Sequence, residues 1–312
     1  MTSKFSKSNR VKIFEVGPRD GLQNEPKVLS VAERLKFIRD LEKSGLENIE
    51  IGAFVRPDRV PQMGSTDLIY KRLMGNRKRD NYWSLVPNLV GLERAVSASV
   101  KNIAIFTATS NSFTKANIGM SIIESFAVYK KVVAEAKKNK MKVRGYLSTA
   151  FGCPYEGRIV PSKTIKLIHS LHDLGVDEVS IGDTIGVADP VSVEKVMRPL
   201  LKAYGSDFLA IHLHDTRGMA LANALRAYDV GVRVFDASAG GLGGCPYAPG
   251  ATGNLATEDL VYMFEKMGIR TGINLNKLTR VSVLFQKVIG KKSSSRYVQA
   301  IERSNKRTLT NW

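Results

Sequence analysis

The sequence predicts an α/β protein built as a closed (β/α)8 barrel, the TIM-barrel architecture, with extra helices at its C-terminal end. Eight β-branched or apolar runs alternate at a nearly even pace with amphipathic stretches, which is the pattern of parallel strands joined by helices. No Gly/Ser-rich or Pro-rich linker divides the 312 residues. The alternation also fits an open doubly wound sheet, but the count of eight favours closure.

The expected strands are short runs rich in apolar and β-branched residues. In chain order they span residues 11–16, 49–51, 82–86, 102–106, 142–148, 178–181, 209–214 and 233–236. Between them apolar residues recur at helical spacing, as over 32–41, 121–136 and 164–174. A further helix is expected over 275–289, before a basic tail. We therefore expect a single catalytic domain over 8–312, in which 270–312 form a helical and basic appendage.

The chain carries a large positive charge. It has 47 Lys and Arg against 29 Asp and Glu, a formal net charge of +18. Such a balance attracts polyanions. The basic clusters nevertheless lack interleaved aromatic residues and no nucleic-acid-binding motif is present, so we interpret them as a solvated surface and expect no specific nucleic acid partner. A nucleic-acid-binding protein on a barrel scaffold remains as a remote alternative.

The sequence also bears on the compartment of the protein. No run of about 18 or more apolar residues occurs, so no membrane span is expected. The basic segment 1–10 has no apolar stretch behind it and does not form a secretory signal. Two distant cysteines, Cys153 and Cys245, cannot form a disulfide framework, which favours a cytoplasmic location.

Polar residues follow several of the expected strands, where a barrel of this kind carries its functional groups. Arg19 and Asp20 come after the first strand, and His212 and His214 end the seventh. Because one residue separates the two histidines, their side chains point to the same face of a strand. Two imidazoles on one face at the mouth of a barrel favour a metal site.

The candidate metal ligands form a mixed nitrogen and oxygen set. They are Asp20, His212, His214 and the amide of Asn254, which follows the eighth strand. Such a set, with open positions and no thiolate, suits Mg²⁺ or Mn²⁺, and Zn²⁺ or Co²⁺ is possible by affinity. We expect a divalent metal cofactor, Mg²⁺ or Mn²⁺ first.

A glycine run, residues 240–244, follows the eighth strand and is neither a strand nor a helix interior. Its backbone is free to approach a ligand closely. Cys245 at its end places a thiol where a flexible loop would close over the site. No Gly-Lys-Ser/Thr follows, so the run is not a nucleotide-binding P-loop.

These residues lie within longer motifs that resemble the 3-hydroxy-3-methylglutaryl-CoA lyase family, part of the metallolyase superfamily named for its Asp-Arg-Glu signature. The resemblance runs from about Val11 to about Ile289, nearly the whole chain. The motifs that carry it are residues 15–25 (EVGPRDGLQNE), 152–157 (GCPYEG), 182–187 (GDTIGV), 241–248 (GLGGCPYA) and 253–263 (GNLATEDLVYM).

The resemblance implies an acyl-CoA substrate, a homodimer and a metal-dependent cleavage of 3-hydroxy-3-methylglutaryl-CoA to acetyl-CoA and acetoacetate. The metal ligands that it implies are Asp20, His212, His214 and Asn254. The catalytic residues that it implies are Arg19, Glu50, Asp183, His212 and Cys245. We also expect Arg19, Asn117 and Arg144 to contact the substrate.

This retro-Claisen cleavage needs a base for the C3 hydroxyl, a positive charge for the thioester enolate and an acid for its carbon. Arg19 suits the second task, and Cys245 suits a proton transfer, as the acid or as the base. The hydroxyl proton is assigned to Asp183 or His212, and the sequence does not choose between them. The alternative is a related aldolase or Claisen-type enzyme acting on a different 3-hydroxyacyl-CoA or a 2-keto acid. The loop cysteine and the short C-terminal appendage argue against it.

Overall fold

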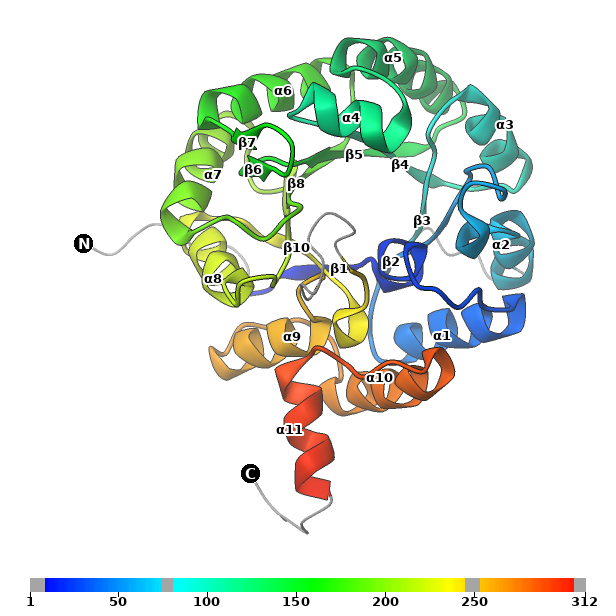
Figure 1. Ribbon diagram of the computed structural model, residues 1–312, viewed down its shortest axis with the longest axis vertical. Coiled ribbons are helices and arrows are strands. Elements are labelled where there is room, and N and C mark those ends of the chain that lie inside the picture. The colour runs from blue at the N-terminus through cyan, green and yellow to red at the C-terminus, as the bar shows by residue number, and fades with distance from the viewer. Residues whose placement is uncertain (1–8, 75–80, 245–252, 306–312) are drawn as a thin grey trace.

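The computed structural model describes residues 9–74, 81–244 and 253–305, in which eight parallel strands close into a barrel (Figure 1). The barrel strands are β1 (Lys12–Glu15), β2 (Asn48–Ala53), β3 (Tyr82–Leu85), β4 (Asn102–Ala108), β5 (Lys142–Ser148), β8 (Glu178–Asp183), β9 (Leu209–Leu213) and β10 (Val234–Ala237). Around the barrel they follow the order β1-β10-β9-β8-β5-β4-β3-β2, and β1 pairs with both β10 and β2. This closure confirms the predicted (β/α)8 fold.

Helices surround the barrel as an outer layer (Figure 1). They are α1 (Val31–Lys43), α2 (Thr66–Met74), α3 (Leu89–Ser97), α4 (Asn111–Ile118), α5 (Ile122–Lys138), α6 (Pro161–Asp173), α7 (Pro190–Tyr204), α8 (Ala220–Val230), α9 (Thr257–Lys266), α10 (Leu275–Ile289) and α11 (Arg296–Asn305). A two-stranded antiparallel hairpin, β6 (Gly152–Cys153) and β7 (Gly157–Arg158), follows β5. The sequence indicated neither this hairpin nor the short α4.

Local sequence signals start the outer helices. Ser30 caps α1, since its hydroxyl accepts from the Glu33 backbone N–H while the Glu33 carboxylate accepts from the Ser30 N–H. Ser121 and Glu124 form the same capping box at α5. Each such cap stabilises a helix by about 1 kcal/mol. The caps therefore set where each helix leaves the preceding loop.

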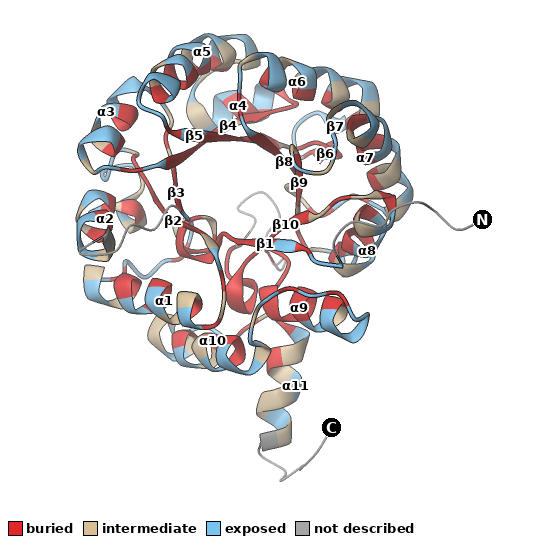
Figure 2. Cartoon of the chain, turned by 180° about the vertical axis from the view of Figure 1, so that it is seen from behind, coloured by how far each residue is buried: buried red, intermediate tan, exposed pale blue. Residues whose placement is uncertain are grey.

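The strands are buried almost throughout, whereas the outer helices bury only their inward faces (Figure 2). This is the expected burial of a parallel sheet covered by helices. One large apolar cluster runs between the two layers and includes residues from β1 through α10. The barrel thus provides a rigid frame that fixes the directions of side chains at the strand ends.

The C-terminal helices pack on one side of the barrel (Figure 1). Helix α10 contacts both α1 and α9, and α11 lies below α9 in this view. Phe285 of α10 stacks on Phe37 of α1 with ring centroids 3.7 Å apart. From this packing we propose that the chain is one domain over 8–312 with 270–312 as its appendage. Among the residues that the structure describes, no helix has the length and apolar character needed to cross a membrane.

Candidate active site

The strand ends converge on a cavity of about 210 Å³ at the C-terminal face of the barrel. Its polar lining comes from several strands and their following loops, namely Arg19, Asp20, Gln23, Asn24, Asn117, Tyr146, Ser148, Ser180, Thr184, His212 and His214. The apolar wall includes Leu85, Phe106 and Phe113. A polar floor with an apolar wall suits a ligand that has a charged end and a less polar remainder.

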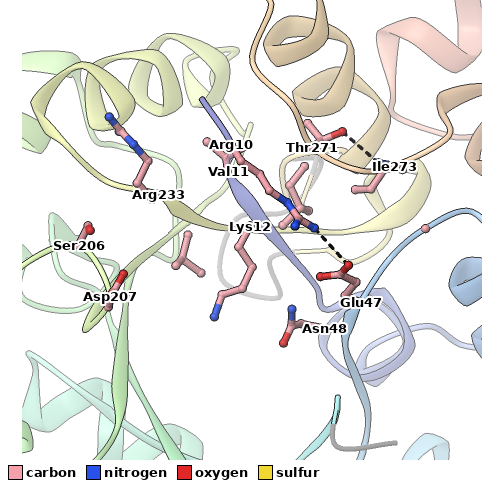
Figure 3. Close-up of a pocket in the computed structure, with 13 residues that line it drawn as sticks. Arg10, Val11, Lys12, Glu47, Asn48, Ser206, Asp207, Arg233, Thr271 and Ile273 are labelled. Carbon is pink, nitrogen blue, oxygen red and sulfur yellow. Dashed lines mark hydrogen bonds and ion pairs between the residues drawn. The ribbon is translucent and has the colours of Figure 1, made fainter. Parts of the chain in front are cut away.

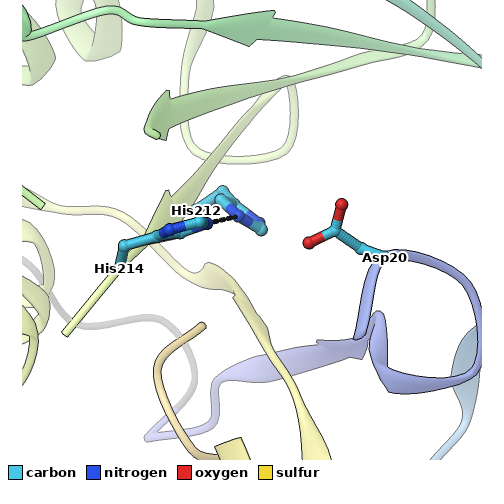
Figure 4. Close-up of side chains that lie close together, drawn as sticks. All are labelled: Asp20, His212 and His214. Atoms are coloured by element: carbon cyan, nitrogen blue, oxygen red, sulfur yellow. Dashed lines mark hydrogen bonds between the residues drawn. The ribbon is translucent and has the colours of Figure 1, made fainter. Parts of the chain in front are cut away.

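Three of the predicted metal ligands lie together in this cavity. One ligand atom each of Asp20, His212 and His214 falls within 4.8 Å of the others (Figure 4). The two imidazole Nε2 atoms are only 3.1 Å apart. Burial first, and then the neighbouring His212, lowers the pKa of His214 to about 3. His214 is therefore neutral near pH 7 and ready to donate a lone pair to a cation.

Asn254, the fourth predicted ligand, joins this group from the segment before α9. Its Nδ2 donates to Asp20 Oδ2 at 2.9 Å and to the Leu242 carbonyl at 2.9 Å. Its Oδ1 is buried and has no hydrogen-bond partner within the described residues, and the same holds for His214 Nδ1. An orphaned amide oxygen is costly to bury, so its presence beside a carboxylate and two imidazoles fits a site for a divalent cation.

A single π-helical turn, Gly17–Gly21, presents Arg19 and Asp20. Arg19 Nε donates to Glu50 Oε2 at 2.7 Å, and its Nη1 donates to Asp20 Oδ1 at 3.0 Å. Burial opposes the charge on Arg19, but Glu50 and Asp20 outweigh it and raise the pKa of Arg19 above its usual value. Burial alone would raise the pKa of Asp20, but Arg19 and the two imidazoles favour its charged form and lower the pKa to about 2.

A second carboxylate, Asp236 on β10, lies behind His212. The distance from Asp236 Oδ2 to His212 Nδ1 is 3.4 Å, and Ser180 Oγ donates to the same oxygen at 2.7 Å. Burial opposes protonation of His212, but Asp236 and Asp20 outweigh it and raise its pKa. A carboxylate on the far nitrogen of a metal-ligating histidine orients the ring toward the metal.

The structure differs from the expected substrate contact of Arg144. Its side chain is fully buried inside the barrel, below the cavity, and it does not line the cavity. Its Nη2 pairs with Asp236 Oδ1 at 2.6 Å, its Nε pairs with Glu178 Oε1 at 2.7 Å, and its guanidinium lies 3.8 Å from the centroid of the Phe14 ring. Because these partners enclose the charge, we assign Arg144 to holding Asp236 and not to binding substrate.

The remaining predicted residues divide between the cavity and its surroundings. Asn117 lines the cavity, from the end of α4. Asp183 is 1% exposed and does not line it, because its two oxygens accept the backbone N–H groups of Val187 and Ala188 at 2.9 and 3.0 Å. Burial raises the pKa of Asp183 to about 6. Cys245 lies outside the described residues.

Sequence reasoning missed several residues that the structure brings to the site. Asp236, Ser180 and Tyr146 all point into the barrel, and Tyr146 donates from its hydroxyl to Glu50 Oε2 at 3.1 Å. The signal that would have found them is polar residues at alternate positions of otherwise apolar strands. Asp236 interrupts the apolar β10, and Arg144, Tyr146 and Ser148 alternate along β5.

A second cavity, about 440 Å³, lies at the opposite, N-terminal face of the barrel (Figure 3). Two of its basic residues are ion-paired: Arg10 pairs with Glu47 at 3.1 Å, and Lys12 pairs with Glu178 at 3.0 Å. In barrels of this type that face contributes to stability and the opposite face carries catalysis. We therefore place the chemistry at the smaller cavity.

Comparison with known proteins identifies the family of the chain. The model of the HMGL-like family matches residues 10–285. The mitochondrial hydroxymethylglutaryl-CoA lyase of Homo sapiens is 47% identical over 93% of this chain and 89% of its own length. The solved HMG-CoA lyase of Bacillus subtilis is 43% identical with a TM-score of 0.91, covering 94% of this chain and 98% of that one. An Acinetobacter baumannii HMG-CoA lyase, solved with coenzyme A and 3-methylmalate, is 35% identical with a TM-score of 0.89, and each chain is covered completely.

Proposed function

The chain belongs to the HMGL-like family, and on that premise we propose that it is a divalent-metal-dependent carbon–carbon lyase that cleaves 3-hydroxy-3-methylglutaryl-CoA to acetyl-CoA and acetoacetate. The observation that carries this proposal is the grouping of Asp20, His212 and His214 beside the ion-paired Arg19. The relatives that match nearly the whole chain are named hydroxymethylglutaryl-CoA lyases.

The reaction breaks the C2–C3 bond of the substrate. The C3 hydroxyl loses its proton and becomes the ketone of acetoacetate, and the electron pair of the broken bond passes to C2 as a thioester enolate. A proton delivered to C2 then completes acetyl-CoA. The protein has to accept one proton, stabilise one developing negative charge and return one proton.

Asp20, His212, His214 and Asn254 would hold the metal, and the donor set supports Mg²⁺ or Mn²⁺ as the ion. A divalent cation at this site supplies positive charge that polarises the substrate oxygens. Asp20 is ionised and His214 is neutral, as ligation requires, whereas the raised pKa of His212 means that a cation has to compete with a proton for that imidazole.

Arg19 would stabilise the enolate oxygen. It lines the cavity, and two of its nitrogens are fixed by Glu50 and Asp20, so its guanidinium is oriented before the substrate binds. Glu50 is fully buried and touches no cavity surface, so its part in catalysis is to position Arg19.

Of the two groups proposed for the hydroxyl proton, His212 lines the cavity and Asp183 does not. We retain His212 as the candidate acceptor of the hydroxyl proton; its single Nε2 lone pair can take either the proton or the cation but not both, so this role and metal ligation are alternatives for His212. Asp183 is then a residue that holds the turn after β8. We retain Cys245 as the acid for C2 and Asn117 as a contact for the acyl-CoA.

The aldolase or Claisen-type alternative is the second candidate, and the whole-length relatedness to HMG-CoA lyases disfavours it. The homodimer, the cytoplasmic location and the absence of a specific nucleic acid partner remain predictions. Sedimentation of the purified chain would test the first, and a salt titration of duplex DNA binding would test the last.

The deciding experiment identifies the products. Purified protein with Mg²⁺ or Mn²⁺ should convert 3-hydroxy-3-methylglutaryl-CoA to equal amounts of acetyl-CoA and acetoacetate, measured by coupled enzyme assays. A panel of other 3-hydroxyacyl-CoA thioesters and 2-keto acids serves as the comparison. Faster turnover of any of these than of 3-hydroxy-3-methylglutaryl-CoA would replace the proposed substrate.

Asp236→Asn should weaken metal binding, because the amide cannot carry the negative charge that orients His212. The expected loss of Mn²⁺ affinity is about 10- to 100-fold, the range for residues behind a metal ligand. Glu178→Gln is the matched control, since Glu178 also pairs with Arg144 but has no contact with His212 among the described interactions. Equal Mn²⁺ affinities in the two variants would assign Asp236 to stability alone.

A further inference from the structure

We propose that the serine segment, Ser293 to Ser295 between α10 and α11, is a positioning element for the metal centre and acts through the glycine run that follows β10. The proposal rests on the assignment of Asn254 as a metal ligand. The serine segment does not line the catalytic cavity, so any effect on the metal has to pass through residues between them.

The serine segment holds the carbonyl groups of the glycine run. Ser293 Oγ donates to the Gly240 carbonyl at 2.8 Å, and the Ser294 backbone N–H donates to the same oxygen at 3.0 Å. Ser294 Oγ donates to the Gly241 carbonyl at 3.2 Å. A Cβ added to Gly241 would lie 2.0 Å from Ser294 Oγ, and Gly241 has a φ of +66°. Glycine is therefore required for this close approach.

The other side of Gly240 is held by a buried carboxylate. Its backbone N–H donates to both oxygens of Glu258, at 3.1 and 2.9 Å, and Ser282 of α10 donates from its hydroxyl to Glu258 as well. Both polar groups of the Gly240 backbone are thus occupied by residues from α9 onward. The start of the glycine run cannot move without breaking contacts to the C-terminal part of the chain.

The glycine run leads directly to the metal ligands. Leu242, next to Gly241, offers its carbonyl to Asn254 Nδ2 at 2.9 Å, and the same Nδ2 donates to Asp20 Oδ2 at 2.9 Å. A Cβ on Gly243 would lie 2.7 Å from Asn254 Nδ2. The path from the serine segment to the carboxylate ligand therefore crosses only Gly241, Leu242 and Asn254.

The serine segment is itself anchored at both ends. Ser295 Oγ and the backbone N–H groups of Arg296 and Tyr297 donate to the Asp259 carboxylate at 2.6, 3.0 and 2.8 Å. On the other side Lys291 pairs with Glu25 at 2.7 Å. Because the segment is fixed on both sides, it can define where the glycine carbonyls lie, and through them the amide of Asn254.

The test is the double variant Ser293→Ala/Ser294→Ala, which removes the hydroxyl donors but keeps the Ser294 backbone donor. We expect its Mn²⁺ dissociation constant, measured well below the melting temperature by the signal of free Mn²⁺, to rise about tenfold, the lower end of the range for residues behind a metal ligand. Turnover at saturating Mn²⁺ should fall, while the Michaelis constant changes little because the segment does not touch the cavity.

Ser304→Ala is the matched control, because the Ser304 hydroxyl lies in α11 and, among the described residues, donates to the Ala300 carbonyl of its own helix. Ser294→Thr retains a hydroxyl and should restore the wild-type dissociation constant. If the double variant fails to fold, Ser294→Ala alone carries the test. A lowered melting temperature with Mn²⁺ binding equal to that of Ser304→Ala would overturn the proposal. Wild-type protein that binds no Mn²⁺ would instead overturn the metal assignment on which it rests.

Discussion

The Arg19→Met variant is expected to lose about 10²- to 10³-fold in turnover while it keeps its fold and its metal, the loss that follows removal of one preorganised donor to a developing oxyanion. The physical reason is the fixed orientation of the guanidinium. Glu50 and Asp20 hold two of its nitrogens, so the charge needs no reorganisation when the enolate forms. Turnover numbers measured at saturating Mg²⁺ and substrate check this.

A complication of this substitution is the buried partner that it leaves behind. Glu50 is fully buried, and an unpaired buried carboxylate costs stability. The double variant Arg19→Met/Glu50→Gln removes that cost, so it should recover stability without recovering turnover. Arg19→Lys keeps the charge but not the fork that contacts both carboxylates, and should be only partly active. Recovery of near-normal turnover in the double variant would make Arg19 a structural residue.

The fold was predictable from the sequence because the strands and helices have different periodicities. Each of the eight expected strands overlaps a barrel strand, and the helix expected over 275–289 matches α10. The hairpin of β6 and β7 was not predictable, since two-residue strands have no periodicity. It depends on turn residues such as Gly157, whose φ is +70°.

The candidate site was predictable mainly where polar residues lie at, or just after, the C-terminal end of a strand. Asp20 and the His212 and His214 pair stand at strand ends, and the structure brings them together. Arg144 was expected to contact the substrate, and the structure buries it within the barrel instead; alternation along a strand indicates which face a residue occupies but not its depth along the barrel axis. Asp236 was missed for a related reason: its role depends on His212 of the neighbouring strand β9, which lies beside β10 only in the closed barrel.

The serine segment was not predictable, because its contacts with the glycine run join residues more than fifty positions apart in the chain. The sequence predicted the helix before it and the basic character around it. It contained no periodic or motif signal for the hydrogen bonds to Gly240 and Gly241. Such contacts are set by the packing of α10 against α1 and α9, which only the folded barrel determines.

Removal of the metal should have the largest effect of all, a complete loss of turnover that Mg²⁺ or Mn²⁺ restores. Asp20, His212 and His214 place three ligand atoms within 4.8 Å of one another, and Asn254 contacts Asp20 Oδ2 through its Nδ2 at 2.9 Å. Without a cation, Asn254 Oδ1 and His214 Nδ1 are buried with no hydrogen-bond partner within the described residues. The measurement is turnover of chelator-treated protein, with residual metal quantified, before and after Mg²⁺ or Mn²⁺ is added.

Metal binding should also stabilise the fold, which gives a second measurement that does not depend on activity. A ligand present at 100 times its dissociation constant stabilises the native state by about 2.7 kcal/mol. The melting temperature should therefore rise with Mn²⁺, and His214→Ala should abolish both this rise and turnover. His169→Ala removes a histidine of α6 that lies away from the cavity and should behave as wild type. Full turnover in metal-free protein would refute the metal-dependent mechanism. If the melting temperature of His214→Ala rises with Mn²⁺ as much as that of the wild type, the cation binds elsewhere.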